Sequence, residues 1–567
     1  MKYLRAITLI AVAGVFLRVA TGPLAQFGAT AWAQTGANPS TSRPPIALLN
    51  DFRPIGGADN NLVNPAFDAV PNSPEIAIAP LNFVSGTDDA MVQGPNPRTI
   101  SNVIAGGTGA NGQSGETDDP VASAWLYVFG QFVDHDLDLE ETPTTTASIN
   151  ITVPRGDPVF RAGTSIAMTR DMRNSATNTI VNTVAGYLDL SQLYGSSSDA
   201  AASLRNADGT LATSDNGQAL PVVGGSFVSG DARVTENPEL TATTTLFMRE
   251  HNYWVGQLAA QHPNWSGDQL YDMAKAITTA EYQNIVYQEY LPLLIGNVLG
   301  PYQGYDSSVN AQAIQEFTTA AFRVGHSEVS DDQTGLDNQG NVVFTESLAQ
   351  AFFNTPQQDE QNGIDALLRG VTADNSQATD VYCVPTLRNL LFAPLVGGDV
   401  DEVDLIAIDI QRERDVGLGT LNQTRQSLGM SAYTSFRDVT SDAMLQANLQ
   451  RVYGTVNNLD LFIGGLAEDH APGAEAGPTF QAIIARQFQA LRSGDRFFWL
   501  NQGFDSNTAS MIANTRLSTI LRRDTDSTSV PTQVFRVGTT PPPSRRWPSG
   551  SINETGHRRP PFVTSGF

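Results

Sequence analysis

The sequence predicts a mainly α-helical protein, built as a single large domain with little β structure and long loops. Apolar residues recur at three- to four-residue spacing in several long segments, which is the period of an amphipathic helix. Few segments show the two-residue alternation of strands, and the chain has neither internal repeats nor alternating strands and helices. Hydrophobic residues make up 41% of the 567 residues, so a chain of this length can bury a substantial core.

The first 33 residues are predicted to be a secretory signal peptide. Lys2 and Arg5 form a short positive region, residues 6–17 form an apolar run, and residues 31–33 (AWA) form a small-x-small cleavage pattern. A membrane anchor is the alternative, but the apolar run is too short to cross a bilayer core of about 30 Å. We therefore expect cleavage near Ala33, a secreted or periplasmic protein, and no stable membrane insertion.

The segments that follow predict a loop-rich arm and then helices. Residues 34–118 are rich in Gly, Pro, Asn, Thr and Asp and are expected to form an extended arm with turns. Helical periodicity begins at Val121, with Trp125, Val128, Phe129 and Phe132 on one face. Further helices are expected at residues 241–261, 266–295, 441–453 and 479–492.

The ends of two of these helices and of the domain are also predicted. Ser441-Asp442 is expected to be an N-cap, and Gly494 a C-terminal stop. We expect one domain over residues 34–537 after the signal peptide 1–33. The tail 538–567 contains three consecutive prolines and two pairs of arginines, which predicts disorder.

Charge and cysteine content exclude several functional classes. The chain has 33 Lys and Arg against 58 Asp and Glu, a formal net charge of −25. This acidity argues against nucleic acid as a partner, because phosphate attraction needs a basic face. Cys383 is the single cysteine, which excludes an intrachain disulfide and a CxxC zinc site, and the apolar residues after it predict burial. No heptad repeat is present, and we expect a monomer.

Two of the six histidines have unusual neighbours. In residues 130–136 (GQFVDHD), Asp134 and Asp136 flank His135, and Gln131 lies four residues earlier on the same helical face. Carboxylates around a histidine at the end of an apolar helix are costly without partners, although a surface helix terminus is the alternative. His326 ends the segment AAFRVGH, where the preceding glycine would allow a flat cofactor to approach. A histidine satisfied within the core is the alternative there.

Two more motifs combine polar groups at regular spacing. Arg233 and Glu236 are three residues apart and can share a helical face, although a surface ion pair worth under about 1 kcal/mol is the alternative. In residues 185–191 (AGYLDLS), Tyr187, Asp189 and Ser191 alternate with apolar residues. Oxygen ligands at that spacing suit a hard cation such as calcium, and an ordinary Asp-containing turn is the alternative.

In their order and spacing these motifs resemble those of the animal-type haem peroxidases of the peroxidase–cyclooxygenase superfamily, from about residue 52 to residue 523. Other matching segments are RPI at 53–55, LDLSQLYGS at 188–196, TTLFMREHN at 244–252, IQRERD at 410–415, NLDLFIGG at 458–465 and GDRFFW at 494–499. The resemblance implies haem b and calcium as cofactors and hydrogen peroxide as a substrate. It implies oxidation of a halide, thiocyanate or small aromatic donor through an oxyferryl state.

The resemblance also implies roles for individual residues. His135 would be the distal base, with Gln131 beside it and Arg233 as the distal arginine. His326 would be the proximal iron ligand. Five further residues match cofactor-binding positions of the family: Asp134 and Glu236 match carboxylates that form ester bonds to haem, Arg412 an arginine that faces a haem propionate, Arg323 the arginine three residues before the proximal histidine, and Asp409 the partner of that histidine. Asp136, Ala185, Tyr187 (through its carbonyl), Asp189 and Ser191 match the calcium site.

Three positions depart from the family pattern. Ala185 stands where the calcium loop usually has threonine, so one side-chain oxygen is missing. Asn237 stands where one mammalian member has the methionine that makes a sulfonium link to haem, and we expect no such link. Asp409 stands where the family usually has asparagine. A carboxylate there would pull the proximal imidazole toward imidazolate and lower the haem potential relative to an amide.

Two other functions are compatible with the superfamily. The first is a fatty-acid dioxygenase, in which a tyrosine three residues before the proximal histidine starts the reaction. Arg323 occupies that position here, which favours a peroxidase. The second is a secreted haem- or calcium-binding adhesion protein without catalysis. It is disfavoured because a scaffold would not need Gln131, His135, Arg233 and His326 together.

Overall fold

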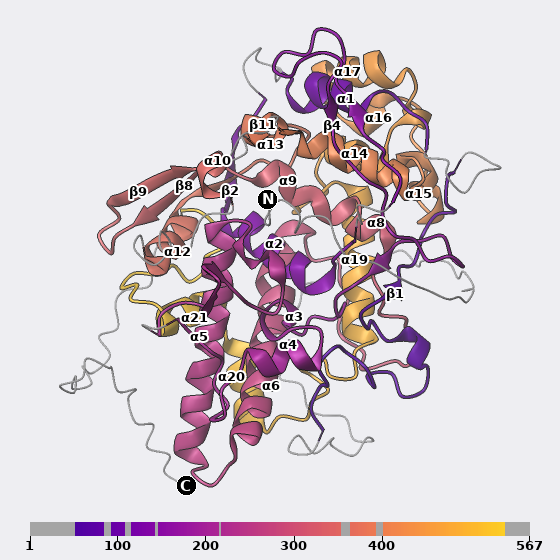
Figure 1. Ribbon diagram of the computed structural model, residues 1–567. Coiled ribbons are helices and arrows are strands. Elements are labelled where there is room, and N and C mark those ends of the chain that lie inside the picture. The colour runs from indigo at the N-terminus through magenta and orange to yellow at the C-terminus, as the bar shows by residue number, and fades with distance from the viewer. Residues whose placement is uncertain are drawn as a thin grey trace.

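The computed structural model describes residues 51–83, 92–107, 115–141, 146–214, 217–352, 363–392 and 401–538. The predicted signal peptide, and the predicted tail beyond Gly538, lie outside the described residues. Within them the chain is mainly helical with only small sheets, as predicted (Figure 1). No helix of the described part is long and apolar enough to span a membrane.

The longer helices are α2 (Trp125–Leu137), α5 (Pro238–Gln261), α6 (Gly267–Ile285), α12 (Ile364–Ala373), α14 (Leu405–Asp415), α17 (Ala443–Tyr453), α19 (Pro478–Ser493), α20 (Ser506–Asn514) and α21 (Leu517–Asp524). The shorter ones are α1 (Pro97–Ile100), α3 (Ser191–Tyr194), α4 (Ser198–Ser203), α7 (Leu291–Leu294), α8 (Gln315–Thr318), α9 (Gly325–Glu328), α10 (Leu348–Ala351), α13 (Pro385–Arg388), α15 (Leu421–Ser427), α16 (Phe436–Val439) and α18 (Leu461–Ala467).

The strands of the described residues pair two by two, always antiparallel. The pairs are β1 (Ser73–Pro74) with β5 (Val181–Asn182), β2 (Asp118–Ser123) with β10 (Asn375–Gln377), β3 (Ile151–Thr152) with β4 (Ser165–Ile166), β6 (Val222–Val223) with β7 (Ser226–Phe227), β8 (Asp332–Leu336) with β9 (Val342–Ser347), and β11 (Leu390–Phe392) with β12 (Asp401–Val403). Such small sheets cannot form a core of their own, so the helices supply it.

The helix ends follow local capping signals. Asp442 caps α17 by accepting hydrogen bonds from two backbone N–H groups, and Gly494 ends α19, both as predicted. The run predicted at 266–295 is one helical stretch, but a π-helical turn at Val286–Tyr290 separates α6 from α7. The prediction that helical structure starts at Val121 was wrong. Val121 lies in β2, which pairs with β10, and α2 begins at Trp125.

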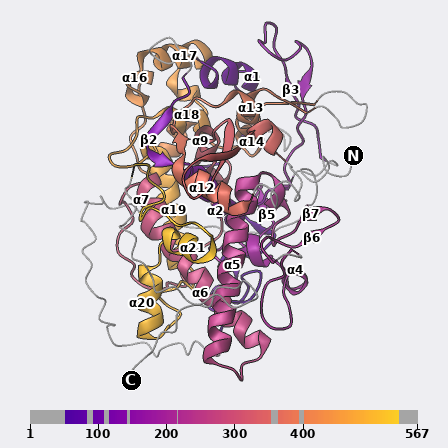
Figure 2. The same ribbon diagram turned by 90° about the vertical axis from the view of Figure 1, so that its left-hand side faces the viewer.

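Helix α2 lies at the centre of the molecule and packs against α5 and α9 (Figures 1 and 2). Aromatic residues fill the space between α2, α5 and α6. The rings of Phe132 and Phe247 stack with centroids 4.9 Å apart, and Tyr282 meets both rings edge-on. Each such aromatic pair contributes about 0.5–1.5 kcal/mol beyond the burial of its area. The helix that carries His135 is therefore held rigidly on its apolar face.

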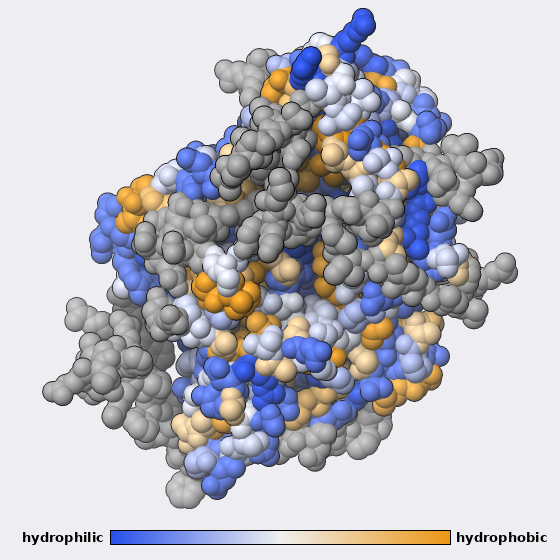
Figure 3. Space-filling view, viewed as in Figure 1, coloured by the Kyte–Doolittle hydropathy of each residue, from blue (hydrophilic) through white to orange (hydrophobic). Residues whose placement is uncertain are grey.

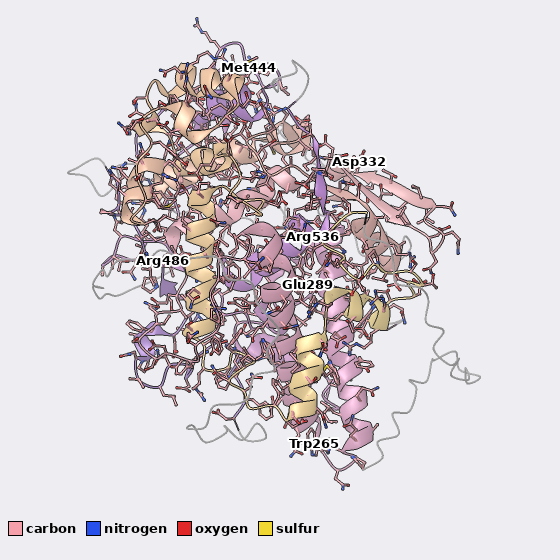
Figure 4. The ribbon with its side chains drawn as sticks, turned by 180° about the vertical axis from the view of Figure 1, so that it is seen from behind. Trp265, Glu289, Asp332, Met444, Arg486 and Arg536 are labelled. Atoms are coloured by element: carbon pink, nitrogen blue, oxygen red, sulfur yellow. The ribbon has the colours of Figure 1, made fainter. Side chains whose placement is uncertain are left out.

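The β8–β9 hairpin and the ends of α5 and α6 lie at the periphery (Figure 1). Figure 4 shows the molecule from behind, with Arg486 on α19 and Trp265 at the turn between α5 and α6. On the face shown in Figure 3, hydrophobic residues form small scattered groups rather than one continuous patch. Cys383 is buried, as predicted.

We expect Arg98 to be a stability determinant. Its guanidinium is fully buried, pairs with Asp157 at 2.7 Å and Asp404 at 2.8 Å, and lies 4.1 Å from the ring centroid of Phe160. Arg98→Ala would leave two buried carboxylates without their cation, which costs about 3–5 kcal/mol. Chemical denaturation should therefore show a much lower midpoint for Arg98→Ala than for a matched change at exposed Arg437. Equal midpoints for the two variants would contradict this expectation.

Glu239 gives a prediction for the pH dependence of stability. It lies on α5 and accepts a hydrogen bond from the Tyr127 hydroxyl of α2, and burial raises the pKa of Glu239 to about 8. The folded protein thus binds this proton more tightly than the unfolded chain, whose glutamate pKa is about 4.3. Its stabilising contribution is full below the unfolded pKa and is lost as the pH rises toward 8.

In the Glu239→Gln variant that pH-dependent loss should disappear. Relative to the variant, the wild type should lose up to about 1.4 kcal/mol of unfolding free energy per pH unit within this window. Urea unfolding at several pH values between 5 and 8 measures the difference. Parallel stability curves for the two proteins would show that Glu239 does not titrate as its burial implies.

Candidate active site

Gln131 and His135 lie on the last turns of α2 and converge on one oxygen atom. Gln131 Nε2 donates to Glu236 Oε2 at 3.2 Å, and His135 Nε2 lies 3.6 Å from the same oxygen. His135 is buried, and burial, together with the nearby charge of Arg233, lowers the pKa of His135 to about 3. The imidazole is therefore neutral near pH 7 and can accept a proton.

Arg233 fixes the end of α2 from a 3-10 helix, Ala232–Thr235. Its Nη2 pairs with Asp231 at 2.7 Å and also donates to the carbonyl oxygens of Asp138 at 2.7 Å and His135 at 3.4 Å. Although burial opposes the charge, Asp231 holds the pKa of Arg233 above its ordinary value. A permanent cation thus lies beside His135.

The sequence did not single out Asp231. Its side chain caps the 3-10 helix by accepting a hydrogen bond from the Arg233 N–H. An Asp two residues before the arginine is therefore the sequence signal that could have identified it. The sequence placed Arg233 and Glu236 on one face. The structure instead turns Arg233 toward Asp231 and Glu236 toward Gln131 and His135.

The second half of the site centres on His326 at the start of α9. His326 Nδ1 lies 2.7 Å from Asp409 Oδ2, and Arg323 Nη1 donates to the other oxygen of Asp409 at 2.9 Å. Arg323 Nη2 pairs with Glu140 at 2.9 Å, a contact that the sequence gave no reason to expect. Because Asp409 engages Nδ1, Nε2 is the nitrogen available to a ligand, and the His326 side chain is 31% exposed.

Asp134 links the two halves. Burial raises the pKa of Asp134 to about 6, while the charges of Arg233, Arg323 and His326 act in the opposite direction. All three groups therefore lie within electrostatic reach of this one carboxyl. Burial likewise raises the pKa of Glu236 to about 7, with Arg233 opposing the shift. Two carboxyls, two guanidinium groups and two imidazoles thus lie around the C-terminal end of α2.

Arg412, on α14, is nearly buried and already holds two acidic partners. Its Nε lies 3.1 Å from Asp171, and its Nη1 lies 2.9 Å from Asp415. The sequence did not identify either partner, and Asp171 is 241 residues away. The contact of Arg412 with a haem propionate stays a prediction.

The predicted calcium loop folds back onto the end of α2. Asp136 Oδ2 accepts from the N–H groups of Asp189 and Leu190 at 3.0 Å, and its Oδ1 accepts from the N–H of Ser191 at 2.5 Å. Ser191 Oγ has two carbonyl oxygens within hydrogen-bond distance of its single O–H, that of Asp136 at 3.2 Å and that of Ala185 at 3.5 Å. The loop therefore places carboxylate, hydroxyl and carbonyl oxygens around Asp136, the residue that follows His135.

The donor set of this loop fits a hard cation. Asp189 Oδ1 is buried without a hydrogen bond, and burial plus the charge of Asp189 raises the pKa of Asp136 well above its ordinary value. Arg53 and Lys275 already act electrostatically on Asp189, and its unpaired oxygen is the atom that a bound cation would still engage. No cluster of three or more His, Cys, Asp or Glu side chains able to hold a metal occurs in the described ranges. The remaining ligands would be Ser191 Oγ and carbonyls such as that of Tyr187.

Comparison with known proteins decides the family. The family model described as animal haem peroxidase matches residues 52–535.

The chain belongs to the animal haem peroxidase family.

The chain is similar to proteins named peroxinectin and eosinophil peroxidase. Peroxinectin A of Dictyostelium discoideum is 30% identical, over 80% of this chain and 90% of that protein. Eosinophil peroxidase of Mus musculus is 33% identical, over 75% of this chain and 67% of that protein. Among solved structures, peroxidase A of Dictyostelium discoideum superposes with a TM-score of 0.75 at 28% identity, covering 86% of this chain and 99% of that one.

A fatty acid alpha-dioxygenase of Arabidopsis thaliana shares the fold. It superposes with a TM-score of 0.73 at 20% identity, covering 87% of this chain and 84% of that one. At this identity the likeness concerns the fold alone. The choice between the two activities therefore depends on the residues of the site.

The residues of this family member fit a haem group. His326 offers Nε2 from a partly exposed ring whose other nitrogen is fixed by Asp409. Asp134 and Glu236, both partly exposed, put carboxyl groups into the same space, and Asp134 makes no side-chain hydrogen bond within the described part of the chain. Partly exposed ionisable side chains gathered between central helices are typical of a cofactor site.

Proposed function

We propose that the protein is a peroxidase that reduces hydrogen peroxide and oxidises a halide, thiocyanate or small aromatic donor. The observation that carries the proposal is the pairing of neutral His135 with the permanent cation Arg233, near the His326–Asp409 pair. The peroxidase names of its relatives support it. We also propose that it acts as a secreted or periplasmic monomer.

The chain's own groups would handle the proton and the developing charge. Haem b, held by His326 Nε2, would supply the redox chemistry when bound. His135 Nε2 would take the proton from one peroxide oxygen and return it to the other oxygen, which departs. Arg233 would stabilise the negative charge that develops on that departing oxygen, because its position is fixed before the reaction by Asp231.

The test is peroxide-dependent oxidation of guaiacol, bromide and thiocyanate by the purified, haem-loaded protein. We expect turnover with at least one of the three donors. Bromide or thiocyanate is favoured over chloride, because Asp409 should lower the haem potential. Haem-loaded protein that consumes no peroxide with any donor would contradict the proposal.

We propose that Asp134 and Glu236 attach the haem through ester bonds formed during exposure to peroxide. Both carboxyls are partly exposed and act on each other electrostatically, and Asp134 also lies within electrostatic reach of His326. The pKa of each is raised by burial, to about 6 and about 7. Extraction with acidified acetone after peroxide treatment should leave haem on the protein. Clean release of haem would contradict the ester bonds and leave the peroxidase proposal intact.

We propose that calcium binds at Asp136, Asp189, Ser191 and the carbonyls of Ala185 and Tyr187. The ion would fix the end of α2 next to His135, so its removal should lower both activity and thermal stability. Metal analysis before and after exhaustive chelation measures occupancy. Full activity with no bound metal would contradict the site.

Asp409→Asn should raise the haem reduction potential. The carboxylate accepts from His326 Nδ1, and Arg323 neutralises only part of its charge through the other oxygen. An amide makes the imidazole a weaker electron donor, so the reaction with peroxide should slow by roughly 10- to 100-fold. Spectroelectrochemical titration of wild type and variant measures the potential. An unchanged potential would show that Arg323 already cancels the carboxylate.

A fatty-acid dioxygenase is the second candidate, because solved structures of that activity share the fold. Arg323 disfavours it, since its guanidinium is fixed between Asp409 and Glu140 at the position where those enzymes need a tyrosine. Oxygen uptake with palmitate, measured beside peroxide consumption, separates the two activities.

A further inference from the structure

One polar contact beside the candidate active site has no part in the roles above. Asn237 is buried at the start of α5, and its Nδ2 donates to Gln131 Oε1 at 2.8 Å. Its other atom, Oδ1, accepts from the backbone N–H of Leu240 at 2.9 Å and so caps the helix. Asn237 therefore connects the N-terminus of α5 to the distal residue Gln131.

These two hydrogen bonds fix the direction of both side-chain amides. The backbone N–H of Leu240 can only donate, so the Asn237 atom beside it must be the oxygen. Asn237 then offers its NH₂ group to Gln131, which must respond with its carbonyl oxygen. The NH₂ group of Gln131 is left to face Glu236 and His135.

The atom at the end of this chain of contacts is a carboxyl oxygen of Glu236. Glu236 Oε2 lies 3.2 Å from Gln131 Nε2 and 3.6 Å from His135 Nε2, and the cation of Arg233 acts on the same carboxyl. This oxygen accepts a hydrogen bond from Gln131, so the pocket favours a hydrogen-bond acceptor at that point. A turned Gln131 would present a carbonyl oxygen there, and two acceptors repel each other.

We propose that Asn237 is a positioning residue that selects anionic electron donors over uncharged ones, by holding the NH₂ group of Gln131 toward the distal pocket. The inference rests on the proposed peroxidase function and deepens it, because it names small anions as the favoured donor class. Asn237 itself touches neither peroxide nor donor.

The Asn237→Asp variant reverses the amide without removing the helix cap. One carboxylate oxygen still accepts from the Leu240 N–H. The other cannot donate, so Gln131 must turn its NH₂ group toward it and its carbonyl toward the pocket. The thermal midpoint of the variant shows that the fold is retained. Asn237→Ser, which keeps a capping hydroxyl but is too short to reach Gln131, is the neutral second variant.

The primary readout uses the ferric, haem-loaded protein without peroxide. Titration with sodium thiocyanate, followed through the Soret band, gives the dissociation constant. We expect Asn237→Asp to bind thiocyanate roughly tenfold more weakly, or about 1.4 kcal/mol, and Asn237→Ser to lie between it and the wild type. In turnover, the KM for thiocyanate should rise relative to the KM for guaiacol, while kcat for guaiacol changes little.

A double-mutant cycle separates this role from simple charge repulsion by the introduced carboxylate. If Asn237 acts through Gln131, Asn237→Asp should have little further effect in a Gln131→Leu background. If the carboxylate repels thiocyanate directly, the loss should be the same in both backgrounds. Such additivity, or an unchanged thiocyanate affinity in folded Asn237→Asp, would overturn the inference. A wild-type protein that consumes no peroxide would instead contradict the proposed function.

Discussion

Replacing His135 by alanine should slow the reaction with hydrogen peroxide by roughly 10²- to 10⁴-fold while haem stays bound. The reason is the state of the imidazole. Burial and the charge of Arg233 keep His135 neutral at every pH near physiological. A base is therefore always available at the C-terminal end of α2 in the wild type. Stopped-flow mixing of the haem-loaded proteins with peroxide at pH 7 measures the loss.

The matched control is His262→Ala. His262 lies exposed at the turn between α5 and α6 and stacks on Trp265, away from α2. Its removal should leave the peroxide reaction unchanged. Equal rates for His135→Ala and His262→Ala would remove His135 from the mechanism, provided that both variants carry haem to the same extent.

Replacing Arg233 by leucine should give the next largest effect, a loss of roughly 10²- to 10³-fold in the peroxide step. The guanidinium is held by Asp231 and by the carbonyl oxygens at the end of α2, so its charge needs no rearrangement when the peroxide bond breaks. Single-turnover rates at saturating and limiting peroxide would separate this loss from weaker peroxide binding.

A control is needed because Arg233→Leu also leaves Asp231 buried without its cation, which is strongly destabilising. The double variant Arg233→Leu, Asp231→Asn removes that charge and should recover stability without recovering the peroxide rate. Recovery of both would mean that Arg233 has a structural role only. Arg205→Leu, on the surface pair with Asp268, serves as the matched arginine change.

Much of the fold could be predicted because its signals are local. The period of apolar residues and the caps Asp442 and Gly494 lie within the helices that they define. Val121 shows the limit of this approach. Its apolar neighbours resemble the helix that follows, but β2 forms because a strand more than 250 residues later, β10, pairs with it.

The residues of the candidate site also fall into two groups, those with a local sequence signal and those brought in by tertiary structure. His135, Arg233 and His326 lie in contiguous motifs, and the order and spacing of those motifs, through their resemblance to the animal-type haem peroxidases, singled these residues out. Their partners come from tertiary structure. Glu140 reaches Arg323 over 183 residues, and Asn237 reaches Gln131 over 106. No sequence period encodes such pairs, so only the folded chain shows how the charges are balanced.

The most direct test of the peroxidase proposal is a visible absorption spectrum of the haem-loaded protein before and after one equivalent of hydrogen peroxide. The account predicts a ferric Soret band that changes quickly in the wild type and returns when bromide or thiocyanate is added. In His135→Ala the band should stay unchanged over the same time. A wild-type protein that binds no haem, or binds haem that peroxide does not alter, would contradict the account.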